Sequence, residues 1–201
     1  HTRFRNVTGV QTCALPISGK SPRRIYVTGH YDTVNIGGQN VTNSSVPGSA
    51  GAATSTDRQQ RPDFNANVDA NGANDDGSGT VLTMELARAF AESGIQFDAT
   101  LVFVAWAGEE QGLVGSNVHT QDLAGNKVPV EAVFNNDIVG NSLGGNGFRD
   151  AESVRVYAIG PEDSPARALA RYIKKTAAVY VPSHRDRKST RLNSSHVSES
   201  R

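Results

Sequence analysis

Apolar residues in this chain gather in short runs, separated by polar and glycine-rich segments. The clearest run is Thr100–Ala107, which is almost continuously apolar, as expected for a strand at the centre of a covered sheet. Three shorter runs also have the composition of strands, namely Arg23–Thr28, Glu131–Phe134 and Val154–Ala158. The pattern therefore predicts four strands spread along the chain.

Apolar positions at helical spacing predict a helix over residues 79–93. Leu82, Leu86, Ala89 and Phe90 recur at i, i+4, i+7 and i+8, which would place them on one face of the helix. The glycine that follows the segment is a typical helix end. We expect this face to pack against the sheet.

Two more helices are predicted, one over Glu110–Leu123 and one from Ser164 onward, where a proline occupies the first helical position. Leu169 and Ile173 mark the buried face of the second helix. Strands that alternate with helices predict an α/β fold. We expect a three-layer sandwich with a central mixed, mostly parallel sheet that is incomplete at the C-terminus.

Both ends of the chain are expected to be foreign to the folded domain. Val7–Ile17 (VTGVQTCALPI) back-translates to a common short-read sequencing adapter, and Asp186–His196 (DRKSTRLNSSH) to its reverse complement. We therefore assign residues 1–18 and 185–201 to adapter, and residues 19–184 to a partial natural domain. Within that domain, residues 35–72 are poor in apolar side chains and are predicted to form a loop insertion.

Leaving out these ends changes the charge of the chain. The whole sequence has 20 basic and 20 acidic residues, and the ends hold 7 and 2 of them, so 13 and 18 remain and the net charge is −5. A basic C-terminal tail that contacts nucleic acid is the alternative interpretation of the last residues. The surplus of carboxylates favours cation binding, and no nucleic-acid partner is expected.

Composition also limits the kinds of site and the location. The single cysteine, Cys13, lies in the segment assigned to adapter, so disulfides and thiolate zinc sites are excluded from residues 19–184. No apolar run approaches the roughly 20 residues that a membrane-spanning helix requires, so no membrane span is expected. A metal site in this chain would therefore use imidazole and carboxylate ligands.

Acidic and imidazole side chains follow three of the predicted strands. Glu109 and Glu110 come just after the buried strand, where two adjacent carboxylates are costly unless they have a partner. His30 and Asp32 follow the first strand, and Asp137 follows the strand that ends at Phe134. Because sites in α/β folds lie at the carboxyl ends of strands, we expect these groups to converge on a metal site.

Asp75 and Asp76 add two more carboxylates, in a glycine-flanked turn before the helix over residues 79–93. A helix N-terminus favours a carboxylate, so one of the pair can be an ordinary cap while the other is free to bind metal. The other candidates also have ordinary interpretations, such as a turn histidine bonded to a nearby aspartate or an acidic helix start.

Four motifs occur together in one order: GHYD, GANDDGSGT, AWAGEEQGLVGS and NNDIVG. In this order and spacing they resemble the zinc-dependent aminopeptidases of the M28 family, across nearly all of residues 19–184. The resemblance implies a zinc exopeptidase-like fold, a peptide substrate with a free N-terminus, and a secreted or periplasmic location.

The resemblance also implies a role for each candidate residue. Four side chains would hold two zinc ions, with His30 and Asp137 on one ion, Glu110 on the other and Asp75 bridging both. Glu109 would be the general base, and Asp32 would support the histidine.

One part of the family pattern has no counterpart here. The family takes its last zinc ligand from a histidine in a later segment near Gly-Asp-His, and the sequence contains no such motif. His119 is instead expected to be a packing or surface residue. We therefore expect the parent protein, rather than this polypeptide, to be active. Alternatives are a one-zinc glutaminyl cyclase-like or carboxypeptidase-like relative, or a non-catalytic domain of the same fold.

Overall fold

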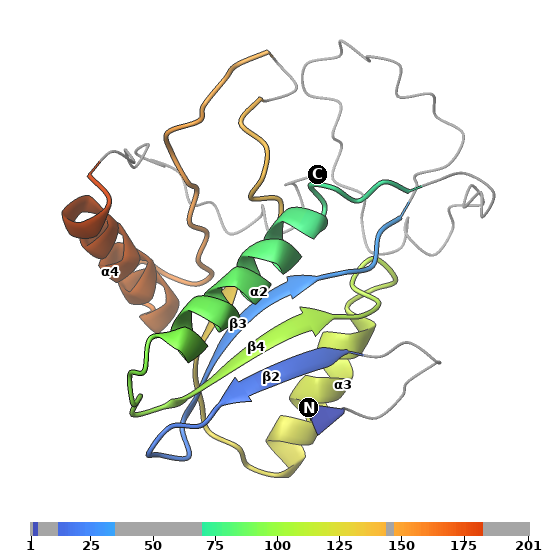
Figure 1. Cartoon of the computed structure of the whole chain (residues 1–201), viewed down its shortest axis with the longest axis vertical. Coiled ribbons are helices and arrows are strands. Elements are labelled where there is room, and N and C mark those ends of the chain that lie inside the picture. The colour runs from blue at the N-terminus through green and yellow to red at the C-terminus, as the bar shows by residue number, and fades with distance from the viewer. Residues whose placement is uncertain (1, 4–11, 35–69, 144–146, 183–201) are drawn as a thin grey trace. The chain divides into compact units, whose positions relative to one another are not determined.

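The computed structural model describes residues 2–3, 12–34, 70–143 and 147–182 (Figure 1). The chain divides into two units. The first unit comprises His1–Gln39 and Asp63–Gly140, and the second comprises Asn40–Pro62 and Asn141–Arg201. All of the candidate site residues belong to the first unit.

The first unit is built on a five-stranded sheet with the strand order β1-β2-β4-β3-β5. Its strands are β1 (Thr2–Arg3), β2 (Cys13–Ile17), β3 (Arg24–His30), β4 (Thr100–Trp106) and β5 (Val130–Asn135). The three longest strands, β4, β3 and β5, are parallel, whereas β1 and β2 run antiparallel to their neighbours. This arrangement confirms the predicted mixed, mostly parallel sheet.

The strand register brings the carboxyl ends of the parallel strands to one edge of the sheet. His30, the last residue of β3, is opposite Trp106, the last residue of β4. On the other side of β3, Thr28 is opposite Asn135, where β5 ends. The segments that follow the three strands therefore begin close together.

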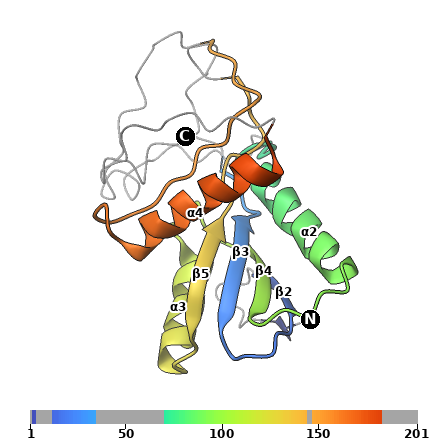
Figure 2. The same cartoon turned by 90° about the vertical axis from the view of Figure 1, so that its left-hand side faces the viewer.

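Two helices cover opposite faces of this sheet, α2 (Gly77–Glu92) and α3 (Val114–Gly125) (Figures 1 and 2). Alternate residues of β4 point to the two faces. Phe103 packs in the cluster on the α2 side, which includes Ala87 of that helix. Val104 packs in the cluster on the other side, which includes Leu123 of α3. The three-layer sandwich is thus confirmed.

The predicted helix over residues 79–93 is present as α2, but its buried face differs in part. Gly79, Thr83 and Ala87 are the buried residues of the helix. Ala89, which was predicted to face the core, is exposed, while Phe90 is half-buried as expected. Small residues take the closest positions because the helix lies directly over β3 and β4, with little room for larger side chains.

The helix predicted to start at Glu110 begins four residues later, at Val114. Gly112 has a φ of 104° and Leu113 a φ of 62°, and neither value is compatible with a right-handed helix. Backbone N–H groups of both residues donate to the Glu109 carbonyl, which closes a turn there. Glu109 and Glu110 therefore lie in a tight turn between β4 and α3.

In the second unit, the strand predicted at Val154–Ala158 is wrong, because these residues pair with no other described segment. Val154 and Tyr157 are 58% and 61% exposed, so these apolar side chains are not buried against another element. The predicted helix is present as α4 (Pro165–Tyr180), whose N-cap Ser164 accepts the first-turn N–H of Arg167.

Other predictions concern residues that the structure describes only in part. The loop insertion over 35–72 lies outside the described residues except for its last three positions, and residues 185–201 lie outside them altogether. Within residues 1–18, Cys13–Ile17 pairs antiparallel with β4 as β2, whatever the origin of that segment. The adapter assignment stays a prediction.

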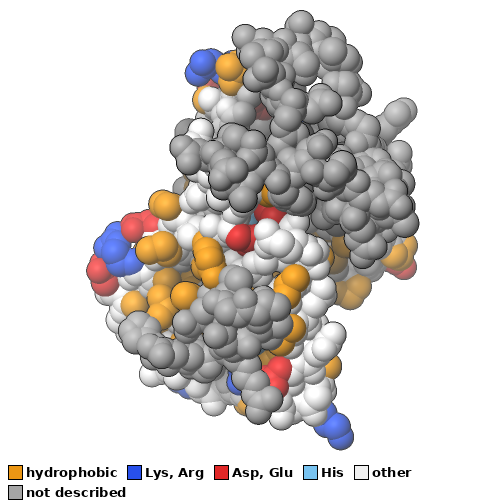
Figure 3. All heavy atoms as spheres, turned by 90° about the vertical axis from the view of Figure 1, so that its right-hand side faces the viewer, with side chains coloured by type: hydrophobic (Ala, Val, Ile, Leu, Met, Phe, Trp, Pro, Cys, Tyr) orange, Lys and Arg blue, Asp and Glu red, His pale blue; other side chains and the backbone are white. Residues whose placement is uncertain are grey.

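Two surface features bear on possible partners. Among the described helices, none is long and apolar enough to span a membrane. On the face drawn in Figure 3, the Lys and Arg side chains of the described residues lie singly or in small groups. Arg23 and Arg88 are each paired with two carboxylates, which offsets their charge.

Candidate metal centre

Four segments meet at the carboxyl edge of the sheet, and each carries a predicted site residue. His30 ends β3, and Asp75 precedes α2 by two residues. Glu109 lies in the turn after β4, and Asp137 lies two residues beyond the end of β5. The fold therefore places these residues together because parallel strands end at the same edge.

His30 is the centre of this group and is only 2% exposed. Its Nε2 atom lies 3.1 Å from Asp75 Oδ1 and 3.9 Å from an oxygen of both Glu109 and Asp137. Its Nδ1 atom lies 3.0 Å from the backbone carbonyl of Asp32. Since a carbonyl can only accept, Nδ1 carries a proton, and Nε2 is the ring nitrogen that faces the carboxylates.

Asp32 contacts His30 mainly through this backbone carbonyl, because its carboxylate oxygen is 3.8 Å from Nδ1. The two carboxylate oxygens of Asp32 instead accept the backbone N–H groups of Glu109 and Glu110, each at 3.0 Å. Asp32 thus joins the end of β3 to the turn that carries both glutamates.

The two adjacent aspartates have different environments, and the peptide bond between them is cis. Asp76 is the N-cap of α2 and is 1% exposed, and its oxygens accept backbone N–H groups of Gly79, His30 and Ile138. Asp75 faces the imidazole Nε2 instead. The structure therefore makes Asp76 the cap and leaves Asp75 as the candidate ligand of the pair.

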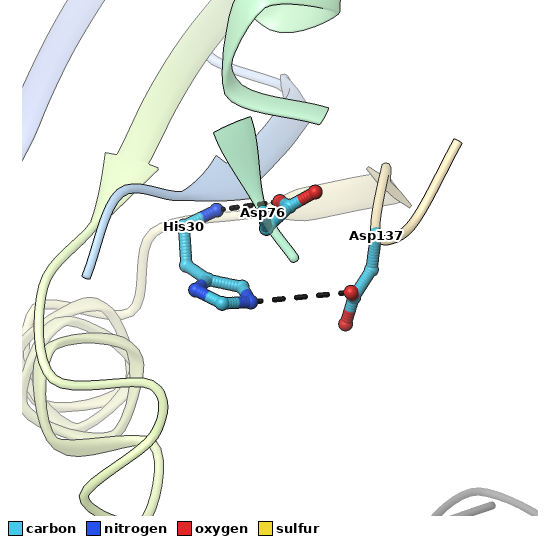
Figure 4. A group of neighbouring side chains, drawn as sticks. All are labelled: His30, Asp76 and Asp137. Atoms are coloured by element: carbon cyan, nitrogen blue, oxygen red, sulfur yellow. Dashed lines mark hydrogen bonds and ion pairs between the residues drawn. The ribbon is translucent and has the colours of Figure 1, made fainter. Parts of the chain in front are cut away.

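In Figure 4 dashed lines join His30 to both Asp76 and Asp137, and one ligand atom from each of the three residues lies within 4.8 Å of the others. The dashed lines separate two kinds of contact: Asp76 bonds to the backbone nitrogen of His30, while Asp137 faces the ring nitrogen. Asp137 Oδ1 is buried and has no hydrogen-bond partner among the described residues. A buried, unpartnered carboxylate oxygen that faces a ring nitrogen suits a shared cation.

The charges of the site shift the pKa values of its groups. Burial lowers the pKa of His30, but Asp75 and Glu109 outweigh this effect, and the pKa is raised to about 9. Burial, together with the nearby charge of Asp76, raises the pKa of Asp137 to about 6. Several carboxylates around one imidazole thus form a negative site that a divalent cation would neutralise.

Glu110 lies in the same turn as Glu109, and its backbone N–H donates to Asp32. Its Oε2 atom is buried. Glu110 thus shares with Glu109 the turn that Asp32 joins to the end of β3.

A network around Asp137 was not foreseen from the sequence. The Asn74 side chain accepts the backbone N–H of Gly140, and the Ser78 hydroxyl accepts that of Val139. Together with the bond from Asp76 to Ile138, these contacts hold the loop after β5 against the start of α2. The only sequence signal was the density of Asn, Asp and Ser before the helix, which alone indicates an ordinary cap.

His119 is a buried packing residue, as expected, and lies in the core between the sheet and α3. Its Nε2 atom is 3.0 Å from the Tyr26 hydroxyl, and its ring contacts those of Tyr26 and Trp106. Burial lowers the pKa of His119. His119 therefore packs against β3 and β4 and is not part of the candidate metal centre.

Comparison with known sequences identifies the family. The sequence profile of peptidase family M28 matches residues 13–198, so the chain belongs to this family of metalloproteases. A "Probable zinc metalloprotease" of Pyricularia oryzae is 41% identical over 174 residues, which cover 77% of this chain and 29% of the relative. Another protein of that name, from Pyrenophora teres f. teres, is 36% identical over 193 residues, which cover 86% and 34%. The chain thus spans about a third of the length of these relatives.

Solved structures share the fold. LapA from Legionella pneumophila superimposes with a TM-score of 0.57 at 24% identity, covering 88% of this chain and 38% of LapA. LapB from the same organism gives a TM-score of 0.56 at 22% identity, covering 85% and 36%. The α/β architecture described above is therefore that of part of a larger known fold.

Proposed function

We propose that the protein to which this chain belongs is a zinc-dependent aminopeptidase, which hydrolyses the N-terminal peptide bond of its substrate. Membership of the M28 metalloproteases supports peptide hydrolysis, and the names of the relatives imply zinc. One of the LapA structures that share the fold is described as an aminopeptidase, which supports the narrower activity.

The observation that carries the proposal is the arrangement of unpartnered donor atoms around His30. His30 Nε2 and Asp137 Oδ1 are both buried without a hydrogen bond among the described residues, and they lie 3.9 Å apart. Asp75 Oδ1 is 3.1 Å from the same ring nitrogen. One imidazole and two carboxylates on three segments are a suitable ligand set for zinc.

In this proposal His30, Asp75 and Asp137 would hold one zinc ion, and Asp75 and Glu110 would contribute to a second. Zinc bound here would polarise the substrate carbonyl and promote ionisation of a water molecule. The chain itself supplies the geometry, because Asp76 and Asp32 fix the backbone of the segments that carry these ligands.

Glu109 is the proposed general base. Its carboxylate lies 3.9 Å from His30 Nε2, and Asp32 holds its backbone N–H, so the side chain projects from a fixed turn into the site. From this position it would take a proton from the attacking water and return it to the leaving amine. The surrounding carboxylates would attract the free α-ammonium group of a peptide and so favour its N-terminal end.

The test uses protein expressed from the complete reading frame. Amino-acid p-nitroanilides should be hydrolysed, the activity should disappear with a chelator and return with zinc, and N-acetylated substrates should be resistant. Activity that survives complete metal removal would exclude a metallopeptidase, and equal cleavage of acetylated substrates would exclude an aminopeptidase. Metal analysis should give two zinc ions per chain, whereas one would favour a one-zinc enzyme.

A further inference from the structure

We propose that Asp76 is a positioning residue, which fixes three segments of the metal centre relative to one another and does not itself bind the metal. The inference deepens the proposed function, because the segments concerned carry the proposed ligands. Its evidence is a set of backbone contacts that exceeds what a helix cap requires.

The Asp76 carboxylate accepts three backbone N–H groups from three parts of the fold. Oδ1 accepts from Gly79 at 2.9 Å and from Ile138 at 3.2 Å, and Oδ2 accepts from His30 at 3.0 Å. Only the bond to Gly79, three residues away, is an ordinary N-cap contact. The donors His30 and Ile138 lie 46 and 62 residues away in the sequence.

Both distant donors belong directly to the site. One is His30 itself, and the other is Ile138, the residue after Asp137. The N–H of His30 lies beyond the last pairing of β3 with β5, which joins Thr28 and Asn135. Asp76 therefore provides the acceptor that a longer β5 would have supplied, and it anchors the histidine through the backbone rather than through the ring.

Two glycines lie where the backbone and this buried carboxylate leave no room for a side chain. A Cβ atom on Gly29 would lie 2.8 Å from the backbone nitrogen of Thr80 and 3.0 Å from Asp76 Oδ2. One on Gly79 would lie 2.2 Å from the backbone oxygen of Asn136 and 2.5 Å from Asp76 Oδ1. Neither glycine has a positive φ, so space rather than backbone conformation explains them. The glycines that flank the site in GHYD and DGSG are thus part of the same arrangement.

The contacts also separate Asp76 from a ligand role. Its contact with His30 is to the backbone nitrogen, while Asp75 Oδ1 lies 3.1 Å from the ring nitrogen Nε2. All three accepted bonds would be present without metal. If Asp76 is a positioning residue, it should protect the His30 and Ile138 amides from hydrogen exchange even when no metal is bound. A residue that acts only as a ligand would not.

The experiment is amide hydrogen exchange followed by NMR on metal-free protein from the complete reading frame, with Asp76→Asn and Asp75→Asn as a matched pair. In the unmodified protein the His30 and Ile138 amides should exchange slowly. Asp76→Asn should speed at least one of them more than tenfold and weaken zinc binding about 10–100-fold. Asp75→Asn should leave both amides protected while zinc binding is lost.

Unchanged exchange at His30 and Ile138 in Asp76→Asn would overturn the proposal, as would a loss of protection in Asp75→Asn. Should Asp76→Asn fail to fold, the unmodified protein still decides, because Ile138 lies outside helices and strands. A fast-exchanging Ile138 amide in the folded protein would refute the bond to Asp76. None of these results depends on peptidase activity, so failure of the proposed function would be seen separately.

Discussion

Replacing Asp32 with asparagine tests how the turn with the two glutamates is held. Asp32 is 14% exposed at its side chain and accepts the N–H groups of Glu109 and Glu110 at 3.0 Å each. Asparagine keeps one acceptor but presents an amide N–H₂ to the second donor. A hydrogen bond to a charged group contributes about 1.5–3 kcal/mol, so Asp32→Asn should destabilise the protein by about that amount.

The same change should reduce turnover more than substrate binding. If Glu109 is the general base, a displacement of about 1 Å in its turn should lower kcat on the order of 100-fold. KM should change less, because proton transfer contributes in the transition state. Zinc held by His30, Asp75 and Asp137 should remain, since His30 Nδ1 bonds to the backbone carbonyl of residue 32 and not to its carboxylate.

The assay combines denaturant unfolding, steady-state kinetics on an amino-acid p-nitroanilide and metal analysis. Asp98→Asn is the control, because Asp98 is 77% exposed at its side chain and pairs with Arg23 on the surface. Such exposed pairs contribute about 0–1 kcal/mol, so kcat should be unchanged. A kcat for Asp32→Asn within twofold of the unmodified protein would refute this role of Asp32, as would a loss of zinc while the turn stays ordered.

Three further predictions concern the site and its support. Glu109→Gln should keep zinc but lower kcat at least about 100-fold, because general-base catalysis contributes roughly that much, and normal turnover would contradict its role. Zinc affinity should rise with pH up to about 9, since the raised pKa values of His30 (about 9) and Asp137 (about 6) mean that the ion displaces protons. Calorimetry in buffers of different ionisation enthalpy should detect proton release, and a flat affinity from pH 6 to 9 would contradict it. Gly79→Ala should cost at least about 1–3 kcal/mol, because its Cβ would lie 2.2 Å from a backbone oxygen. Gly125→Ala, which meets no atom within 4 Å, should be neutral or stabilising by up to about 1 kcal/mol, and thermal melts of both variants would decide.

The sequence was sufficient to predict the sheet edge and the residues that reach it. Apolar runs located β3, β4 and β5; His30 is the last residue of β3, and Glu109 and Asp137 follow β4 and β5 within a few residues. Parallel strands then bring those residues to the same edge of the sheet, so local sequence patterns were enough to predict that they lie close together. The same reasoning failed at Val154–Ala158, because an alternating run forms a strand only when another strand pairs with it, and no described segment does.

What could not be predicted depends on side-chain direction. Asp75 and Asp76 are adjacent and chemically identical, so the local pattern could not tell which one caps α2 and which one faces His30, and only the family resemblance favoured Asp75 as the ligand. The start of α3 was also missed, although Gly112 gave a signal for a break in the turn. The backbone bonds of Asp32 to the glutamate turn join residues 77 and 78 positions apart, and no local pattern reveals them.

The central claim is that His30, Asp75 and Asp137 bind one divalent ion together. Anomalous diffraction at the zinc edge, from crystals of the zinc-loaded protein expressed from the complete reading frame, tests it most directly. We predict a peak about 2.0–2.2 Å from His30 Nε2 and from a carboxylate oxygen of each aspartate. An ordered zinc ion elsewhere, with these three side chains turned away from it, would contradict the account.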